Sequence, residues 1–71
     1  MSDLEVRHLR MLFESRARVQ KRLTELDVAL EEFVLEMRDS GASARGMAEA
    51  LGVGPSTIQT WTSNARARRD G

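Results

Sequence analysis

The sequence predicts an all-α protein: a long N-terminal coiled-coil helix in residues 1–40, followed by a helix-turn-helix with a basic tail in residues 41–71. Three observations support this fold class. No Gly or Pro occurs before Gly41. Within that stretch apolar residues recur at alternating intervals of three and four, which is the spacing of a coiled coil. After it, two short apolar segments are separated by Gly52, Gly54 and Pro55.

The first helix has a clear start and a clear stop. Ser2 and Glu5 have the spacing of a capping box, in which the Ser oxygen accepts from a free amide and Glu5 reaches back. Good helix formers then continue to Gly41. We expect one helix of unusual length, although a break near Ser15–Arg16 is the alternative.

The apolar pattern of this helix is a heptad repeat over four heptads. Nine positions, which we call the seam, are spaced 3, 4, 3, 4 and are apolar except for Arg16: Leu9, Leu12, Arg16, Val19, Leu23, Leu26, Leu30, Phe33 and Met37. The pattern predicts a homodimer, with the first eight seam residues at its interface. Alternatively, the helix packs on its own C-terminal segment. Ala29, Val34 and Met37 widen the stripe near its end, so both arrangements are compatible.

Charge along the helix is polarised. The first half carries Arg7, Arg10, Arg16, Arg18, Lys21 and Arg22 against Glu14, whereas the second half carries Glu25, Asp27, Glu31, Glu32 and Glu36. A parallel dimer would place like halves together and Arg16 against Arg16. An antiparallel dimer would place opposite charges together, so we expect that orientation. The alternative is a solvated surface with no orienting role.

Residues 41–71 predict two short helices. Ser43 is a suitable cap for a helix over residues 44–51, and Met47, Ala48 and Leu51 share one face of it. Gly52 suits the left-handed residue that ends a helix. Pro55 suits the first position of a second helix, which we expect to reach Arg66–Arg68. Its inward face would consist of Ile58, Trp61, Thr62 and Ala65.

The segment containing Ala48, Gly52, Val53, Ile58 and Trp61 resembles the helix-turn-helix superfamily. It is most similar to the region-four domains of sigma factors and the C-terminal DNA-binding domains of resolvases. The resemblance covers about 25 of the 71 residues. One departure is that Gly54 replaces the usual Ser or Thr cap. The resemblance implies that residues 55–66 enter the major groove of double-stranded DNA. The alternative is an ordinary pair of packed helices.

The expected DNA-binding surface is polar and mostly uncharged at its front. Gln and Asn side chains suit adenine in the major groove, and Arg side chains suit phosphates or the minor groove. Arg45 would meet a phosphate and the C-terminal arginines would grip the backbone. The expected contacts are Arg45, Ser56, Thr57, Gln59, Thr60, Ser63, Asn64, Arg66, Arg68 and Arg69. Individually, each of these residues also fits a solvated surface.

Composition limits the remaining choices. The chain has no net charge, with −2 in residues 1–40 and +2 in residues 41–71, which predicts weak non-specific binding to DNA. With one His, no Cys and no Tyr, we expect no catalytic site, cofactor or metal. No signal peptide or membrane-length apolar run is present, so we expect a cytoplasmic protein at the nucleoid. The excess of Arg over Lys is typical of GC-rich bacterial genomes.

Together these features predict a homodimeric, sequence-preferring DNA-binding protein, either a small transcriptional regulator or a nucleoid-associated protein. Across a coil of ~38 residues the two reading ends would stand roughly 50 Å apart. That distance exceeds the ~34 Å between adjacent half-sites, so it predicts widely spaced half-sites or bridging of DNA segments. The alternative function is a protein–protein interaction module or phage-type adaptor, whose coiled coil binds a transcription component.

Overall fold

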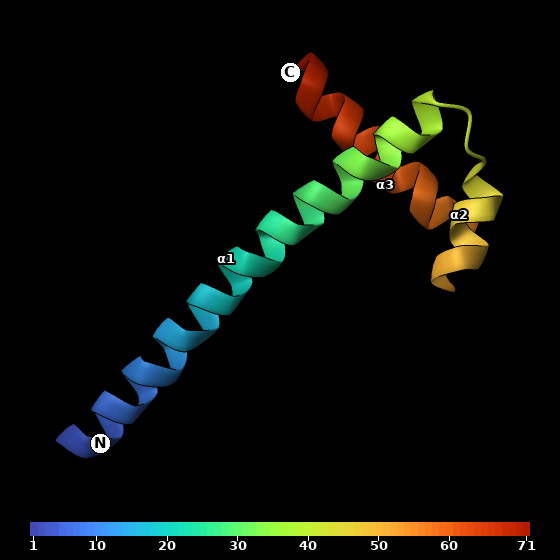
Figure 1. Cartoon of the computed structure of the whole chain (residues 1–71). Coiled ribbons are helices and arrows are strands. Elements are labelled where there is room, and N and C mark those ends of the chain that lie inside the picture. The colour runs from blue at the N-terminus through green and yellow to red at the C-terminus, as the bar shows by residue number, and fades with distance from the viewer.

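The computed structural model describes all 71 residues. It contains three α-helices and no strands. Helix α1 spans Asp3–Asp39, α2 spans Ala44–Leu51 and α3 spans Pro55–Asp70. The predicted all-α architecture, a long first helix followed by shorter ones, is confirmed (Figure 1). Helix α1 runs unbroken through Ser15–Arg16 and projects far beyond the other two, so the molecule measures 58 × 29 × 14 Å. No helix contains an apolar stretch long enough to cross a membrane.

Both ends of α1 are built as the sequence predicts. The Ser2 Oγ accepts from the Glu5 amide at 3.2 Å, and the Glu5 carboxylate accepts from the Ser2 amide at 2.9 Å. Hydrogen bonding from Ser2 to the Glu5 carboxylate, by the backbone amide first and the side chain second, lowers the pKa of Glu5 below its ordinary value. At the other end, Gly41 adopts φ 103°, a conformation that side chains disfavour, and the chain leaves the helix there.

Helix α2 begins at the predicted residue. The Ser43 Oγ accepts from the Gly46 amide at 2.9 Å, which satisfies one of the free donors of the first turn. A Cβ at Gly46 would lie 3.0 Å from that same oxygen. The cap itself therefore occupies the space that a side chain at position 46 would need.

A three-residue turn connects α2 to α3. Gly52 takes the left-handed conformation, with φ 71° and ψ 31°, and the Val53 amide donates to the Ala48 carbonyl at 3.0 Å. Gly54 precedes Pro55 and makes no side-chain cap bond, as expected from its missing hydroxyl. Helix α3 then continues to Asp70, beyond the predicted end at Arg66–Arg68.

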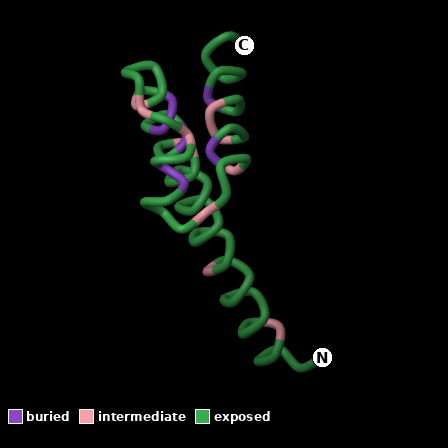
Figure 2. Tube along the Cα trace, turned by 90° about the vertical axis from the view of Figure 1, so that its right-hand side faces the viewer, coloured by how far each residue is buried: buried purple, intermediate pink, exposed green.

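Burial is confined to the C-terminal end of the molecule, where α2 and α3 pack against the end of α1 (Figure 2). We call residues 31–71 the head. Its apolar cluster consists of Val34, Met47, Ala48 and Ile58, and the partly buried Met37, Val53 and Trp61 pack against it together with Ala42 and Ala44. The structure thus confirms Ile58 and Trp61 as inward anchors of α3.

Three details of the head differ from the sequence prediction. Leu51 was expected on the inward face of α2 but is 53% exposed, because α2 ends there and its last side chain lies at the edge of the cluster. Ala29 is exposed although it belongs to the widened stripe. Leu35, which lies off the seam, is 1% exposed. It is buried because α3 crosses α1 on a side of the helix away from the seam; Figure 1 shows the crossing.

Candidate nucleic-acid interface

The front of α3 forms a polar surface that no other part of the chain covers. Ser56, Gln59, Thr60 and Ser63 are all exposed, while Ile58 on the opposite side of the helix is completely buried. Thr57, also an expected contact, is half-buried at the edge of this surface. We call Ser56, Gln59, Thr60 and Ser63 the α3 polar face.

Hydrogen bonds within the helix affect one member of this face. The Thr60 Oγ1 donates to the Ser56 carbonyl at 3.0 Å, so its proton is used within α3 and its oxygen remains an acceptor. The side chains of Ser56, Gln59 and Ser63 make no hydrogen bond to the protein. Three side chains on one side of α3 are therefore free to donate and accept.

Two of the expected DNA contacts are turned toward α1 instead. The Asn64 amide Nδ2 donates to Glu31 Oε2 at 3.0 Å, and the Arg68 Nη1 donates to Glu31 Oε1 at 3.2 Å. The Glu31 side chain is only 9% exposed. Asn64 and Arg68 thus satisfy a carboxylate that would be costly to leave unpaired, and together they tie the second half of α3 to α1.

The other two C-terminal arginines lie beside Asp39, the last residue of α1. The Arg66 Nη2 donates to Asp39 Oδ1 at 3.1 Å, and the Arg69 Nη1 stands 3.8 Å from Asp39 Oδ2. All three side chains are more than half exposed, so these ion pairs contribute little and open readily.

Arg45 is the remaining expected contact. It lies exposed in the first turn of α2 and forms no ion pair. Of the four basic residues in residues 41–71, it is the one whose charge is not already paired with a carboxylate of α1. The structure therefore divides the expected contacts into a free polar face with Arg45, a weakly paired Arg66 and Arg69, and an engaged Asn64 and Arg68.

Sequence reasoning missed the role of Glu31. The charge pattern places it in the acidic half of the first helix, expected to face a second copy or solvent, yet it is 7% exposed. A signal was present, because Asn64 and Arg68 are four residues apart and therefore neighbours on one face of α3. Two donors on a helix face imply an acceptor on the opposing helix. The identity of that acceptor required knowing which face of α1 receives α3.

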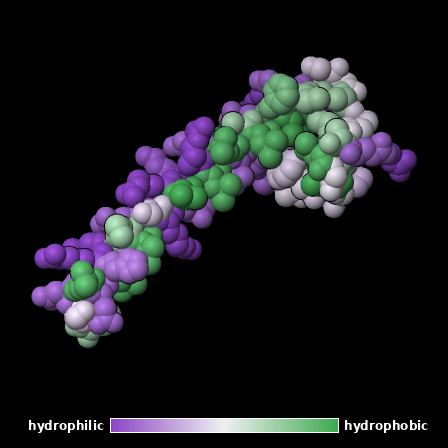
Figure 3. Space-filling view, turned by 60° about the horizontal axis from the view of Figure 1, so that its bottom comes forward, coloured by the Kyte–Doolittle hydropathy of each residue, from purple (hydrophilic) through white to green (hydrophobic).

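The expected dimer interface is exposed along its whole length. The seven apolar residues from Leu9 to Phe33 in the seam are between 37% and 68% exposed, and Arg16 is exposed among them. Figure 3 shows hydrophobic side chains running along the projecting part of α1 and into the head. Monomeric soluble proteins rarely leave so long a contiguous apolar surface uncovered.

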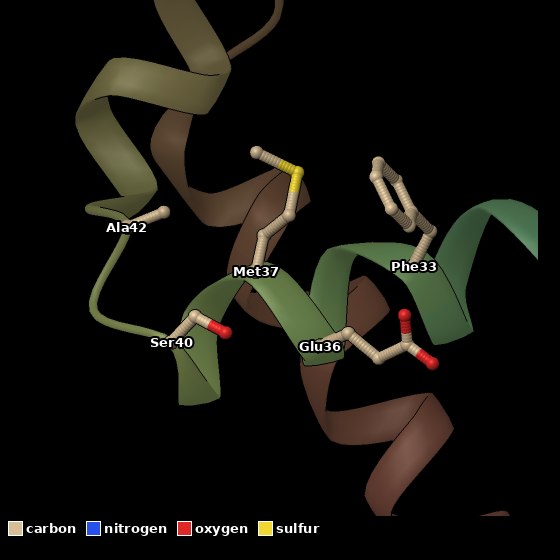
Figure 4. Close-up of a pocket in the computed structure, with 5 residues that line it drawn as sticks. All are labelled: Phe33, Glu36, Met37, Ser40 and Ala42. Carbon is tan, nitrogen blue, oxygen red and sulfur yellow. The ribbon is translucent and has the colours of Figure 1, made fainter.

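The seam leads into two hollows on the head. One is a groove of about 170 Å³ between α1 and α2, lined only by apolar residues: Leu30, Phe33, Val34, Met37, Met47, Ala50 and Leu51. The other, of about 280 Å³, adjoins it at Phe33 and Met37 and has Glu36 and Ser40 at its rim. In Figure 4, Phe33 and Met37 project from the same side of α1. No group of three or more acidic, His or Cys side chains is placed to hold a metal ion.

Comparison with protein-family models, with known proteins and with solved structures finds no match to this chain.

Proposed function

We propose that the head is a helix-turn-helix that binds double-stranded DNA, with α3 entering the major groove. The observation that carries this proposal is the division of α3 into two sides. One side is anchored by Ile58 and Ala65, and the other presents the α3 polar face to solvent. A rigidly held helix with free donors and acceptors along one side is what readout of base edges requires.

The turn supports the same proposal. Ala48 is small and buried where the two helices approach, Gly52 supplies the left-handed turn, and Val53 packs against the cluster. Four residues after Gly54, Ile58 is completely buried. These features fit a helix-turn-helix, in which the first helix holds the second in a fixed orientation.

The charge distribution favours base contacts over a tight grip on phosphates. Arg45 has no partner in the protein, and Arg66 and Arg69 can exchange the exposed Asp39 for a phosphate. Few phosphate contacts predict a shallow salt dependence and weak binding by a single head. A small regulator or nucleoid-associated protein that uses two heads together fits these properties.

One observation favours the alternative, a protein–protein interaction module. Three of the four basic residues in residues 41–71 face carboxylates of their own chain, which reduces the positive field available to DNA. In that case the apolar seam would receive a transcription component or another protein partner. The two proposals differ in whether the purified chain selects DNA.

The experiment is in-vitro selection of bound duplexes from a random pool, followed by gel shifts of the selected sequence over a range of salt. We expect an enriched sequence and a binding constant that falls as salt rises. Gln59→Ala should weaken binding to the selected site by roughly 5- to 100-fold, which corresponds to the ~1–3 kcal/mol of one good base contact.

The matched control is Gln20→Ala. Gln20 is the other glutamine of the chain and is exposed on α1, far from the head. Its removal should leave DNA affinity unchanged at a protein concentration where both variants have the same oligomeric state. Selection that enriches no sequence, or equal effects of the two substitutions, would refute DNA readout by α3 and favour the protein-interaction module.

A further inference from the structure

The apolar surface of α1 and the groove of the head form one continuous surface. Leu30 and Phe33 belong to both, since they are seam residues and also line the groove. Leu51, the exposed last residue of α2, stands across the groove from them. Only seven of the 71 residues are buried, so the chain alone has a small core and much apolar area left to cover.

We propose that this surface is covered by a second copy of the chain, packed antiparallel so that residue 21 of each copy lies at the midpoint, with the N-terminal part of one seam closing the groove on the other copy's head. This inference does not depend on DNA binding, because it rests on the seam, the groove and the charges of α1.

The charges of α1 favour a second copy of the chain as the partner and favour an antiparallel orientation of its α1. Residues 1–22 carry six basic and three acidic side chains, whereas residues 23–40 carry one basic and six acidic. A second copy running the opposite way places its basic half along the acidic half of the first, at both ends of the coil. Glu31 and Asp39 are already paired with arginines of α3, so the preference rests on the other four acidic side chains: Glu25, Asp27, Glu32 and Glu36. A parallel copy would place these four beside four more, which is unfavourable.

The seam itself fixes the register. With residue 21 at the midpoint, Leu9 of one copy packs against Phe33 of the other, Leu12 against Leu30, and Val19 against Leu23. All seven exposed apolar seam residues then meet a partner. Arg16 falls opposite Leu26, beside Glu25 and Asp27 of the second copy. Its long apolar stem can lie across the leucine while its guanidinium reaches a carboxylate.

In this register the coil ends inside the head. Leu9 and Leu12 of the second copy arrive at the levels of Phe33 and Leu30, where the groove is open, and Leu51 borders the same space. Leu51, exposed at the end of α2, would be covered by this contact. The proposed dimer contact therefore stabilises the packing of α1 and α2 in each head, in addition to linking the two heads.

Cysteine cross-linking tests orientation and register directly, because the chain contains no cysteine. Leu12→Cys and Leu30→Cys are purified separately, mixed, and oxidised gently. We expect a disulfide between the two variants and little within either alone, because in the proposed register residue 12 lies about 27 Å from its own counterpart. Leu9→Cys with Leu51→Cys should also cross-link, and this pair reports on the groove. Ala17→Cys, exposed on the side of α1 away from the seam, is the negative control.

Sedimentation tests whether the dimer forms and whether the seam holds it. We expect the unmodified chain to be a dimer, and Leu23→Glu to weaken dimerisation at least ~100-fold, since it buries two carboxylates in the interface. Leu4→Glu makes the same substitution at an exposed leucine off the seam and should leave the dimer intact. A monomer at high concentration, self-cross-linking of each single-cysteine variant, or equal effects of the two glutamates would overturn the proposal. None of these readouts involves DNA.

Discussion

At the scale of single residues, Glu31 is the side chain on which the position of α3 most depends. Its carboxylate is nearly buried and accepts from Asn64 at 3.0 Å and from Arg68 at 3.2 Å, and no buried side-chain nitrogen or oxygen of the protein lacks a partner. An ionised carboxylate in such a place is tolerated only while its oxygens are satisfied. The two donors on α3 therefore act as structural residues of the head.

Arg68→Ala should destabilise the protein by about 1–2 kcal/mol, because Glu31 would keep one donor and lose its charge partner. The value is at the lower end for a buried charge because Arg68 is 37% exposed. Arg69→Ala is the matched control. Its ion pair with Asp39 spans 3.8 Å between side chains that are half exposed, so its removal should cost less than about 0.5 kcal/mol. Urea unfolding followed by circular dichroism, at one fixed protein concentration, measures both. Equal losses would show that Glu31 does not need Arg68.

At the scale of elements, the α2–α3 turn depends on backbone conformation at two glycines with opposite requirements. Gly52 has φ 71°, which side chains disfavour, whereas Gly54 has φ −79° and ψ 154°, which any residue adopts. The backbone of Gly54 is nearly that of Ser43, with φ −81° and ψ 146°, where a serine does cap the following helix.

Gly52→Ala should therefore cost about 1 kcal/mol, since the left-handed conformation penalises a Cβ although nothing lies within 4 Å of it. Gly54→Ser should instead stabilise the protein by a few tenths of a kcal/mol by adding the missing cap to α3. A Cβ at Gly54 meets only the Ser56 Oγ, at 3.8 Å. Thermal unfolding of both variants checks the opposite signs. A stabilising Gly52→Ala would show that the turn relaxes out of the left-handed conformation.

The elements were predictable because their signals are local. The capping box, Gly41, Ser43 and Gly52 each fix a helix end through their own backbone or side chain, so the helix boundaries follow closely from the sequence. The face of α1 that receives α3 was not predictable in this way. The heptad pattern marked the seam, but α3 packs on another side of α1, where it buries Leu35 and Glu31 and leaves the seam exposed.

The candidate site was predicted in part for the same reason. Periodicity alone placed Ile58 inward and Ser56, Thr60 and Ser63 outward, since one helix face determines the other. Which basic residues stay free was not predictable. That outcome depends on which acidic side chains of α1 come close to α3 after packing, and it separates Arg45 from Arg68.

At the scale of the whole molecule, the proposed register places the two heads closer together than the length of α1 alone implies. Val34, under the centre of each head, is 13 residues from the midpoint at residue 21. The heads are therefore about 26 residues apart along the coil, or roughly 40 Å, instead of the roughly 50 Å expected from the full helix. This spacing approaches the 34–36 Å of one turn of DNA.

The heads also lie on one side of the proposed dimer. Glu31, which contacts α3, follows the seam residue Leu30 by one position, a rotation of about 100° around α1. The second copy lies in the direction between Leu30 and Phe33, and the buried Glu31, Val34 and Leu35 are centred about 120° from that direction. Helix α3 is thus about a third of a turn away from the second copy. The twofold axis of an antiparallel pair is perpendicular to the plane of the two helices, so it keeps both copies of α3 on the same side of that plane. One duplex can meet both.

The dimer should therefore select two inverted half-sites whose centres are about one helical turn apart on one duplex. Inserting about 5 base pairs between them rotates the second half-site to the far side of the DNA, and about 10 restores its face but moves it a further ~34 Å away. Because a coiled coil does not stretch by that distance, both insertions should reduce affinity to that of a single head, by at least ~10-fold. Gel shifts with the three spacings measure this. Affinity that is indifferent to spacing, together with pairs of duplexes held by one dimer, would instead place the heads on opposite sides and favour bridging.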